Sequence, residues 1–376
     1  KSLKTTKWYF FKKKKNIFKN LKEAADFSEN EIKKSLNLWT ESDVPICFLL
    51  SGGLDSGILS SLYSKISIDK INTFSLGFRQ KQLEKWNEIN VANTLAKKLR
   101  SNHRNIVLKV DDMLSELFKM INILGEPYGG GLPNWYIFKE ISKKHKVAIS
   151  GTGGDEIFGN YNRYFNMFNN KRTKFDKKCF KNNYFYNRNY EADDKWKKNY
   201  LQFKFIKNKL PNKFYNMLND EKLNNLKKNI SILDVKTQLN NEFLYITDKF
   251  SMAHSLEVRT PYLDHELVEN IYGIQEKFRL SNENYKPLLK NIGQKHLTKS
   301  YLNFPKHGFS IPLSIWMRGK LKKLVVSLIG RKNLKKEGLI SEKFYDDYVI
   351  KMFNGENNNI QLIWNVFMLH AWLKVS

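Results

Sequence analysis

The strongest constraint on the fold is the alternation of short apolar runs with segments of helical periodicity. In chain order we predict a helix over 28–42, a strand over 44–50, a helix over 58–63, a strand over 71–77, a helix over 84–99, a strand over 104–110, a helix over 113–124 and a strand over 146–150. Apolar runs of this length are typical of parallel strands that are buried on both faces. The pattern therefore predicts an α/β fold, a parallel sheet with helices on both faces, followed by a mainly helical C-terminal half.

The first predicted helix has a recognisable beginning. Ser28 and Glu31 have the spacing of a capping box, in which each side chain bonds the backbone of the other residue. Ile32, Leu36 and Trp39 follow as an apolar stripe at helical spacing. We therefore expect this helix to begin at Ser28.

A glycine-rich loop, SGGLDS at residues 51–56, directly follows the first predicted strand. Its two glycines let backbone N–H groups approach an anion closely, and the next helix presents its positive end. The loop lacks the Gly-Lys-Ser/Thr element of P-loop kinases and GTPases, so it is a phosphate cradle of another kind. The structural alternative is a tight turn with a Ser cap.

A second glycine-rich loop, SGTGGDE at residues 150–156, follows another apolar strand. Ligands of open parallel sheets bind at the carboxyl ends of the strands, so we expect both loops to serve one site. Each loop brings a carboxylate, Asp55 or Asp155, and Mg²⁺ usually takes one or two carboxylates together with a nucleotide. We therefore predict that Asp55 and Asp155 bind Mg²⁺. Alternatively, the acidic pair at 155–156 only stabilises the first turn of a helix.

The first loop resembles the pyrophosphatase loop of the N-type ATP pyrophosphatases, and the whole pattern is similar to the synthetase domain of glutamine-hydrolysing asparagine synthetases. The resemblance runs from about residue 25 to the C-terminus. It is carried by SDVPICFLLSGGLDS (42–56), TFSLGF (73–78), WNEINVANTLAKKL (86–99), SGTGGDEIFGNYNRY (150–164), DKFSMAHSLEVRTPYLDHELVE (248–269), KPLLK (286–290) and FPKHGFSIPLSIWMRGKL (304–321). The stretch 248–264 is much more specific than SGGLDS, which many relatives share.

The resemblance implies an ATP-dependent, amide-forming ligase. The side-chain carboxylate of aspartate would attack the α-phosphorus of ATP, pyrophosphate would leave, and ammonia would displace AMP from β-aspartyl-AMP to give asparagine. Attack at phosphorus needs positioning and charge neutralisation, which glycine loops, Mg²⁺ and lysines supply. The implied cofactors are ATP and Mg²⁺, and the implied partners are aspartate and ammonia.

The family pattern also implies roles for individual positions. The residues expected to bind ATP and pyrophosphate are Leu50, Ser51, Gly52, Gly53, Asp55, Ser56, Leu76, Ser150, Gly151, Lys286 and Lys306. Among them, Leu50 and Leu76 would flank the adenine, while the two lysines would face the departing phosphates. The candidate catalytic residues are Asp55, Asp155, Lys306 and Thr152.

Five further charged residues are left open between a substrate contact and a structural role. They are Glu88, Asp248, Glu257, Arg259 and Asp264. The last four lie among apolar neighbours, where internal ion pairs explain them as well as substrate contacts do. Glu88 falls at an acidic position of the family pattern, but a helix-surface position is the simpler interpretation.

The chain departs from the family pattern in two ways, which concern the carboxylate that is amidated and the source of the nitrogen. Well-studied asparagine synthetases have an acidic residue where this chain has Thr152, and that residue is associated with forming the aspartyl-adenylate and receiving ammonia. A hydroxyl cannot take a proton from the nitrogen nucleophile as a carboxylate can, nor provide the same charge. Relatives with Thr or Asp there resemble a less characterised branch, part of it in cell-surface polysaccharide or peptide modification. Neither Cys47 nor Cys179 can be the N-terminal nucleophile of a glutaminase domain, so we expect this chain to use free ammonia.

Four segments are expected along the chain. They are a remnant or linker from an upstream glutaminase domain over 1–24, an ATP-pyrophosphatase α/β core over 25–165, a basic aromatic helical insertion over 166–230, and the helical part of the synthetase domain over 231–376. The chain begins with Lys1 instead of Met, so we expect a processed or incomplete sequence.

The composition sets broad limits on function. The chain has 376 residues and a net charge of +28. Two cysteines are too few for a disulfide framework, and no apolar run reaches the roughly 18 residues of a membrane span. We therefore expect a cytoplasmic protein without a membrane partner. The sequence does not give the oligomeric state, and a homodimer is one assembly that it allows.

Three interpretations of function remain open. The leading one is a ligase of the asparagine synthetase type, and a variant of it acts on another carboxylate. The second keeps the adenylating core but modifies tRNA, and the net charge of +28 supports it. Basic residues interleaved with aromatics over 171–230 are also what a single-stranded nucleic-acid surface would use. Inward packing of these aromatics is the simpler explanation, so we do not expect a nucleic-acid substrate. The third is a catalytically silent nucleotide-binding or scaffold protein, against which the intact loops argue.

Overall fold

The computed structural model describes most of the chain. The described residues are 9, 12, 14–78, 88–159, 161, 194–202, 226–281, 285–304, 311–356 and 359–376. Lys306, Cys179 and most of the expected insertion over 166–230 therefore lie outside the described residues.

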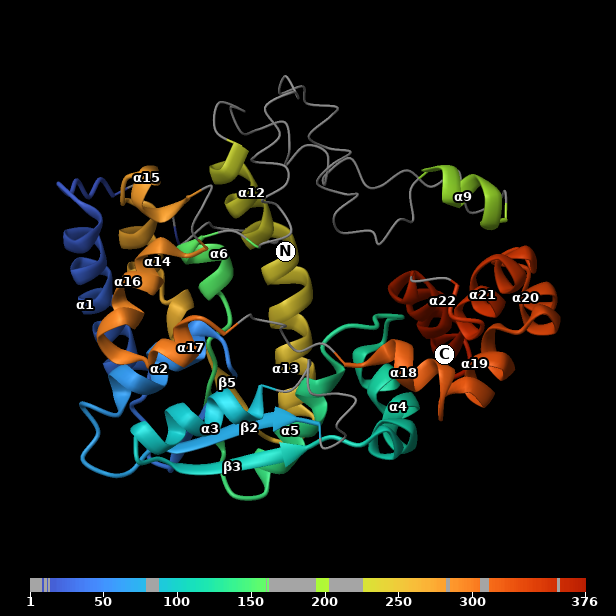
Figure 1. Cartoon of the computed structure of the whole chain (residues 1–376), viewed down its shortest axis with the longest axis horizontal. Helices are drawn as coiled ribbons and strands as arrows, with labels where there is room; N and C mark the ends of the chain where they lie inside the picture. Colours follow the sequence, from blue (N-terminus) through green and yellow to red (C-terminus); the bar gives the residue numbers. More distant parts are fainter. Residues whose placement is uncertain are drawn as a thin grey trace, which may run out of the picture.

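The centre of the fold is a five-stranded sheet in which every strand pair is parallel, as the sequence predicts (Figure 1). The strands lie in the order β3-β2-β1-β4-β5. Their bounds are Ile46–Leu49 for β1, Asn72–Gly77 for β2, Asn102–Val107 for β3, Val147–Ile149 for β4 and Glu257–Arg259 for β5. The order places β1 next to β4, so the two glycine-rich loops leave adjacent strands.

Alternate residues of the strands face two separate hydrophobic cores, which is why the apolar runs are nearly continuous. Cys47 and Leu49 of β1 belong to one core, whereas Phe48 and Leu50 belong to the other. The sheet therefore needs a helical layer on each face, and both layers are present.

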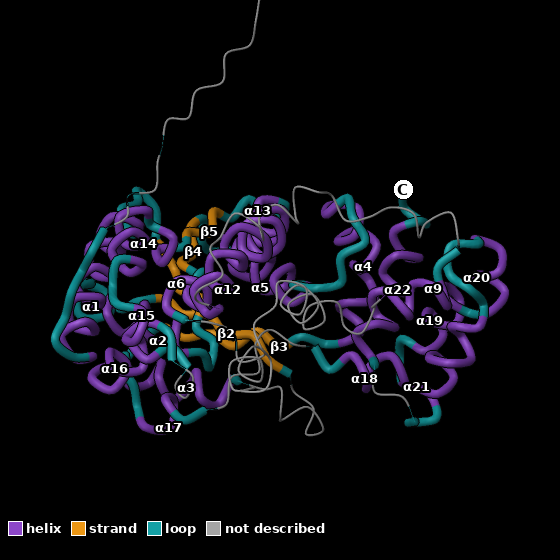
Figure 2. The backbone as a smooth tube through the Cα atoms, turned by 90° about the horizontal axis from the view of Figure 1, so that it is seen from above, coloured by secondary structure: helices purple, strands orange, loops and turns teal. Residues whose placement is uncertain are grey.

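The core that contains Phe48 is covered by helices from both halves of the chain. They are α1 (Leu21–Trp39), α2 (Leu54–Tyr63), α3 (Ile89–Lys98), α6 (Gly154–Phe158), α14 (His265–Tyr272) and α16 (Pro287–His296), with the short elements η4 (Pro261–Leu263), α15 (Glu276–Arg279) and α17 (Lys299–Leu302) nearby. Figure 2 shows this group on one side of the sheet. Residues distant in the sequence are thereby brought to the same edge of the sheet.

The core that contains Cys47 extends into a helical lobe on the other side of the sheet (Figure 2). Its helices are α4 (Val110–Leu124), α5 (Leu132–Ser142), α9 (Asp194–Tyr200), α13 (Tyr245–Met252), α18 (Leu313–Arg318), α19 (Lys322–Ile329), α20 (Arg331–Glu337), η5 (Tyr345–Ile350), α21 (Lys351–Phe353) and α22 (Ile360–Trp372). The segments α12 (Leu226–Asp234) and η3 (Val235–Leu244) precede α13 directly. Trp196 of α9 packs on Phe344, so this aromatic residue faces inward.

The predicted beginning of the first helix is wrong. Helix α1 begins at Leu21, and its N-cap is Asn20, whose side chain accepts a hydrogen bond from the backbone N–H of Glu23 at 2.9 Å. Ser28 lies buried inside the helix and donates to the carbonyl of Ala24 at 2.7 Å. The Asn20 and Glu23 pair has the same spacing as the pair that we identified, and the Asn20 side chain caps the helix one turn before the buried residues Ala24 and Ala25.

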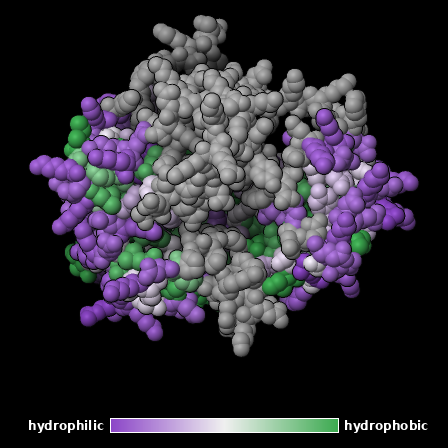
Figure 3. Space-filling model, turned by 45° about the horizontal axis from the view of Figure 1, so that its top comes forward, coloured by the Kyte–Doolittle hydropathy of each residue, from purple (hydrophilic) through white to green (hydrophobic). Residues whose placement is uncertain are grey.

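The described surface is mainly hydrophilic on the face that Figure 3 shows, and its hydrophobic side chains form small separate patches. Among the described helices, none is both long and apolar enough to cross a membrane.

Candidate active site

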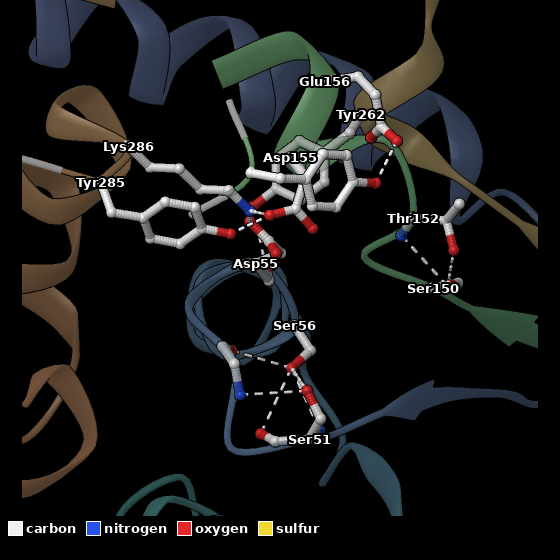
Figure 4. A network of polar contacts seen from close by, with 12 residues as sticks. Ser51, Asp55, Ser56, Ser150, Thr152, Asp155, Glu156, Tyr262, Tyr285 and Lys286 are labelled. Carbon is white, nitrogen blue, oxygen red and sulfur yellow. Dashed lines mark hydrogen bonds and ion pairs between the residues drawn. The ribbon is translucent and has the colours of Figure 1, made fainter. Parts of the chain in front are cut away.

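The first loop closes on itself through its two serines. The backbone N–H of Ser51 donates to Oγ of Ser56 at 3.1 Å, and the N–H of Gly53 donates to Oγ of Ser51 at 3.1 Å. The two serine hydroxyls lie 2.9 Å apart (Figure 4). Tyr301 holds the loop from outside, because its hydroxyl donates to the carbonyls of Ser51 and Gly53. The N–H groups of Ser51 and Gly53 thus already donate to oxygen atoms, and phosphate would offer them the same kind of acceptor.

The second loop touches the first one, and its glycines make this contact possible. A Cβ on Gly151 would lie 3.0 Å from Cβ of Asp55 and 3.0 Å from the backbone nitrogen of Ser56. A Cβ on Gly154 would lie 2.5 Å from Oδ1 of Asp55. Real Cβ atoms essentially never come as close as 2.5 Å, and 3.0 Å is tighter than most real contacts, so a side chain at either glycine would force its neighbours to move. The glycines therefore bring Asp55 and Asp155 to one place.

Lys286 joins the two carboxylates of the site. Its Nζ lies 2.5 Å from Oδ1 of Asp55 and 2.9 Å from Oδ1 of Asp155, and Figure 4 shows the three side chains converging. Lys286 is 1% exposed and Asp55 is 6% exposed, so the contact is shielded from water. Tyr262 adds a hydrogen bond from its hydroxyl to the carbonyl of Asp55 at 3.1 Å.

The backbone around Lys286 is held in an unusual conformation. Lys286 is the N-cap residue of α16 and has φ +47°, in the left-handed region that non-glycine residues rarely adopt. Pro287 follows at the first helical position, where its fixed φ suits a helix start. This junction aims the lysine back at the sheet.

Thr152 and Ser150 form a small hydroxyl cluster in the second loop. Their hydroxyls lie 2.8 Å apart, and the backbone N–H of Thr152 donates to Oγ of Ser150 at 3.2 Å. The N–H of Ser150 in turn donates to the carbonyl of Arg259 in β5, which fixes the end of β4. Thr152 therefore lies at the same edge of the sheet as Asp55 and Asp155.

A buried polar network lies behind the second loop. Glu156 is 2% exposed and accepts a hydrogen bond from the hydroxyl of Tyr161 at 2.5 Å. Burial and the neighbouring charge of Asp155 raise the pKa of Glu156 to about 8. Ser231 donates to the carbonyl of Glu156 at 2.7 Å, and Arg279 reaches the hydroxyl of Ser231. This network ties α6 to α12 and supports the loop that carries Asp155.

Glu88 contacts the first loop, which corrects the expectation of a helix-surface position. It is 8% exposed, and its Oε2 accepts a hydrogen bond from the backbone N–H of Gly52 at 3.0 Å. A Cβ on Gly52 would lie 3.1 Å from Cβ of Glu88, so the two backbones are close as well. Glu88 therefore holds a backbone donor of the glycine-rich loop.

Leu50 and Leu76 lie at the carboxyl ends of the adjacent strands β1 and β2. Leu50 is buried, its N–H donates to the carbonyl of Phe74 at 2.8 Å, and its carbonyl accepts from the hydroxyl of Ser75. Leu76 is half-buried. Both leucines are thus at the edge where the two loops begin.

Two charged residues of the segment 248–264, Arg259 and Asp264, contact α1 and α14. Arg259 donates to the carbonyls of Trp39 and Glu41 at 3.0 and 2.6 Å, and it pairs with Glu257 at 2.6 Å. Asp264 caps α14 through the N–H groups of residues 266 and 267. Asp248 is exposed on α13. The contacts of Arg259 and Asp264 join α1, β5 and α14.

Three tyrosines complete the site without having been predicted. Tyr262 and Tyr301 hold the first loop, and the hydroxyl of Tyr285 donates to Oδ1 of Asp155. They come from segments more than 100 residues from their partners. Tyr262 lies in the stretch 248–264 that carries the family resemblance, whereas no local pattern marks Tyr285 and Tyr301. By contrast, Cys47 lies buried in β1, and burial raises the pKa of its thiol to about 12, so it is unsuited to be a nucleophile.

The residues present fit a nucleotide with a divalent cation. Asp55 and Asp155 already converge on one cationic group, the ammonium of Lys286, and carboxylate oxygens are the donors that Mg²⁺ prefers. Within the described part of the chain, no group of three or more His, Cys, Asp or Glu residues could hold a metal by itself. The two carboxylates of Asp55 and Asp155 would therefore bind a metal ion whose remaining ligands include phosphate oxygens of the nucleotide.

Comparisons with known proteins agree with this architecture. The family model for asparagine synthase matches residues 29–374. The chain is 25% identical to the glutamine-hydrolysing asparagine synthetase 1 of Bacillus subtilis, over 99% of this chain and 62% of that protein. It is 22% identical to asparagine synthetase 3 of the same organism, over 89% of this chain and 57% of that protein. A putative asparagine synthetase of Methanocaldococcus jannaschii is 32% identical over 34% of this chain and 24% of that protein.

The parallel sheet with a helical layer on each face defines the class as an α/β protein with a mainly helical C-terminal half. The chain belongs to the asparagine synthase family. It spans about three-fifths of the length of the two Bacillus subtilis relatives.

Proposed function

We propose that this chain activates a carboxylate with ATP and transfers the activated acyl group to ammonia, and that the carboxylate is the side chain of aspartate. The observation that carries the proposal is the meeting of two glycine-rich loops on adjacent strands, each with an aspartate that contacts Lys286. Membership of the asparagine synthase family supports the same reaction class.

The proposed reaction has two steps. A carboxylate oxygen of aspartate attacks the α-phosphorus of ATP, the bond from this phosphorus to the bridging oxygen breaks, and pyrophosphate leaves with the bonding electrons. Ammonia then attacks the acyl carbon of β-aspartyl-AMP, AMP leaves, and the nitrogen loses a proton to give asparagine. Neither step requires a side-chain nucleophile, so positioning and charge stabilisation are the main demands.

The residues of the site meet these demands. The N–H groups of Ser51 and Gly53 would exchange their serine acceptors for pyrophosphate oxygens, while Asp55 and Asp155 would hold Mg²⁺. The metal would supply charge neutralisation for the phosphates. Lys286 would face the negative charge that grows on the leaving group, and Lys306 is proposed for the same task by the family pattern.

Because of Thr152, the activated carboxylate could also belong to a molecule other than aspartate. Its hydroxyl bonds Ser150 and cannot accept a proton from the nitrogen nucleophile as a carboxylate can. A related amidotransferase that acts on another carboxylate, in a sugar or a peptide, is therefore the alternative function. Modification of tRNA is less well supported, since Trp196 of the basic aromatic segment packs inward on Phe344.

The test is ATP–pyrophosphate exchange with Mg²⁺, with and without aspartate, followed by mass spectrometry of the products with ammonium chloride as nitrogen source. We expect exchange that depends on aspartate, and AMP and asparagine as products. The Asp55→Asn variant should lose exchange about 10²- to 10³-fold. The control is Asp111→Asn, an exposed aspartate of α4 that pairs with Lys320. If exchange occurs only with a carboxylate other than aspartate, the assignment of aspartate as substrate is overturned. If no carboxylate supports exchange, the proposal that the chain adenylates a carboxylate is overturned.

A further inference from the structure

Tyr285 contacts both partners of the ion pair between Lys286 and Asp155. Its hydroxyl donates to Oδ1 of Asp155, the same oxygen that lies 2.9 Å from Nζ of Lys286. Its ring centroid lies 5.0 Å from that Nζ, within the range of a cation–π contact. Figure 4 shows the tyrosine lying alongside the lysine and ending at the carboxylate.

The backbone fixes where Tyr285 can reach. The neighbouring Lys286 is in the left-handed conformation, and Pro287 begins α16 immediately afterwards. The end of α6 packs against this junction, because a Cβ on Gly159 would lie 3.2 Å from Cγ of Lys286. The tyrosine is therefore placed over the first turn of α6, which carries Asp155.

The two donors to Asp155 differ in charge. Lys286 is a cation, so its attraction to the carboxylate competes with that of a bound metal ion. The Tyr285 hydroxyl is neutral and orients the carboxylate without this competition. Hydrogen-bond partners behind a metal-binding carboxylate commonly set its orientation and its affinity for the metal.

We propose that Tyr285 is a positioning residue that holds the carboxylate of Asp155 in the orientation that binds Mg²⁺ with the nucleotide. This inference rests on the proposed function, because it takes Asp155 as a metal ligand. It assigns to Tyr285 an effect on metal affinity and not on the folding of α16.

The experiment measures metal binding without turnover. Mn²⁺ replaces Mg²⁺ as the spectroscopic probe, and the full chain is titrated by electron paramagnetic resonance in the presence of an ATP analogue with a methylene group between the α- and β-phosphorus atoms. Tyr285→Phe should weaken Mn²⁺ binding about tenfold, at the lower end of the effect of such partners. Tyr245→Phe is the matched control, since it also removes one tyrosine hydroxyl bond, to the carbonyl of Leu124.

Asp155→Asn separates the failure of this inference from the failure of the proposed function. If Asp155→Asn loses Mn²⁺ binding while Tyr285→Phe binds like Tyr245→Phe, the role of Tyr285 is overturned and the metal site stands. If Asp155→Asn binds Mn²⁺ normally, both assignments fall. In exchange assays, Tyr285→Phe should need more Mg²⁺ for half-maximal rate but keep most of the rate at saturating Mg²⁺. An equal loss at all Mg²⁺ concentrations, together with a lower Tm, would indicate a structural role and overturn the proposal.

Discussion

Nζ of Lys286 lies 2.5 Å from Oδ1 of Asp55, although 231 residues separate the two in sequence. The same nitrogen lies 2.9 Å from Oδ1 of Asp155 in the other loop. One buried cation therefore connects α16 to both strand ends. This contact joins two local loop motifs into one site, because without it a buried carboxylate, Asp55, and a partly buried one, Asp155, would face each other without a shared cation.

Removing this cation should destabilise the fold. Lys286→Met leaves Asp55 and Asp155 without their shared partner, and breaking a buried ion pair on one side costs about 3 kcal/mol or more. Urea unfolding measures the change in the free energy of unfolding. Lys320→Met is the control, since Lys320 pairs with Asp111 at the surface and such pairs contribute less than about 1 kcal/mol. Equal losses in the two variants would contradict the central role of Lys286.

The contact between Glu88 and the first loop leads to a second prediction. Glu88→Ala removes the acceptor that the buried N–H of Gly52 uses at 3.0 Å, which should lower the free energy of unfolding by about 1–3 kcal/mol. Glu88→Gln keeps an acceptor oxygen and should lose less. We also expect Glu88→Ala to raise the KM for ATP in the exchange assay, because the loop would lose its fixed shape.

The comparison of these two variants distinguishes shape from charge. If Glu88→Gln is as impaired as Glu88→Ala in KM, the charge of Glu88 matters and not the hydrogen bond to Gly52. Stability and KM unchanged in both variants would show that the contact is dispensable.

The sequence predicted the parts of the fold that are encoded locally. The apolar runs at β1, β2 and β4 mark buried strands. The glycines of the two loops were predicted to let the backbone approach an anion, and the close contact of the two loops was seen only in the structure. Strand β5 could not be predicted in this way, because three residues that include the exposed Glu257 do not form an apolar run. Helix α5 was also missed, since its buried side chains Trp135, Tyr136, Ile137 and Phe138 are consecutive and hide the helical period.

The same division applies to the site. The site residues of the two loops could be predicted, because glycines, serines and an aspartate stand together in the sequence of each loop. Tyr285 and Tyr301 reach the loops only through the packing of α16 and α17. Tyrosine is common in this chain, with 18 copies, so its presence alone marks nothing. Long-range contacts of this kind depend on tertiary structure and leave no local pattern.

The link between α1 and α16 should make stability depend on acid pH. Burial alone would raise the pKa of Glu29, but hydrogen bonds from Lys33, Lys295 and His296 outweigh it and lower the pKa to about 2. A carboxylate with a lowered pKa in the folded state stabilises the fold above its unfolded pKa of about 4.5. This contribution should be lost as the pH falls from about 4.5 through 2.

Glu29→Gln is the variant that checks this dependence. Urea unfolding between pH 6 and pH 3 should show a shallower loss of stability in Glu29→Gln than in the native chain, with a slope difference of at most about 1.4 kcal/mol per pH unit. Glu23→Gln near the exposed start of the same helix serves as the control. Parallel pH curves for the native chain and Glu29→Gln would refute the prediction.

Thr152 is the position at which the acceptor chemistry can be changed. Thr152→Glu would place a carboxylate in the loop that carries Asp155. The family pattern has an acidic residue at this position and associates it with receiving ammonia. A general base typically contributes at least about 10²-fold to such a step. We therefore expect ammonia-dependent formation of asparagine to rise about 10²-fold, with a smaller change in aspartate-dependent exchange, because adenylation precedes the nitrogen step. Thr152→Gln, of similar size but without a base, should give no rise. If Thr152→Glu forms no more asparagine than Thr152→Gln, the threonine does not limit the reaction, and a carboxylate other than aspartate becomes the better candidate acceptor.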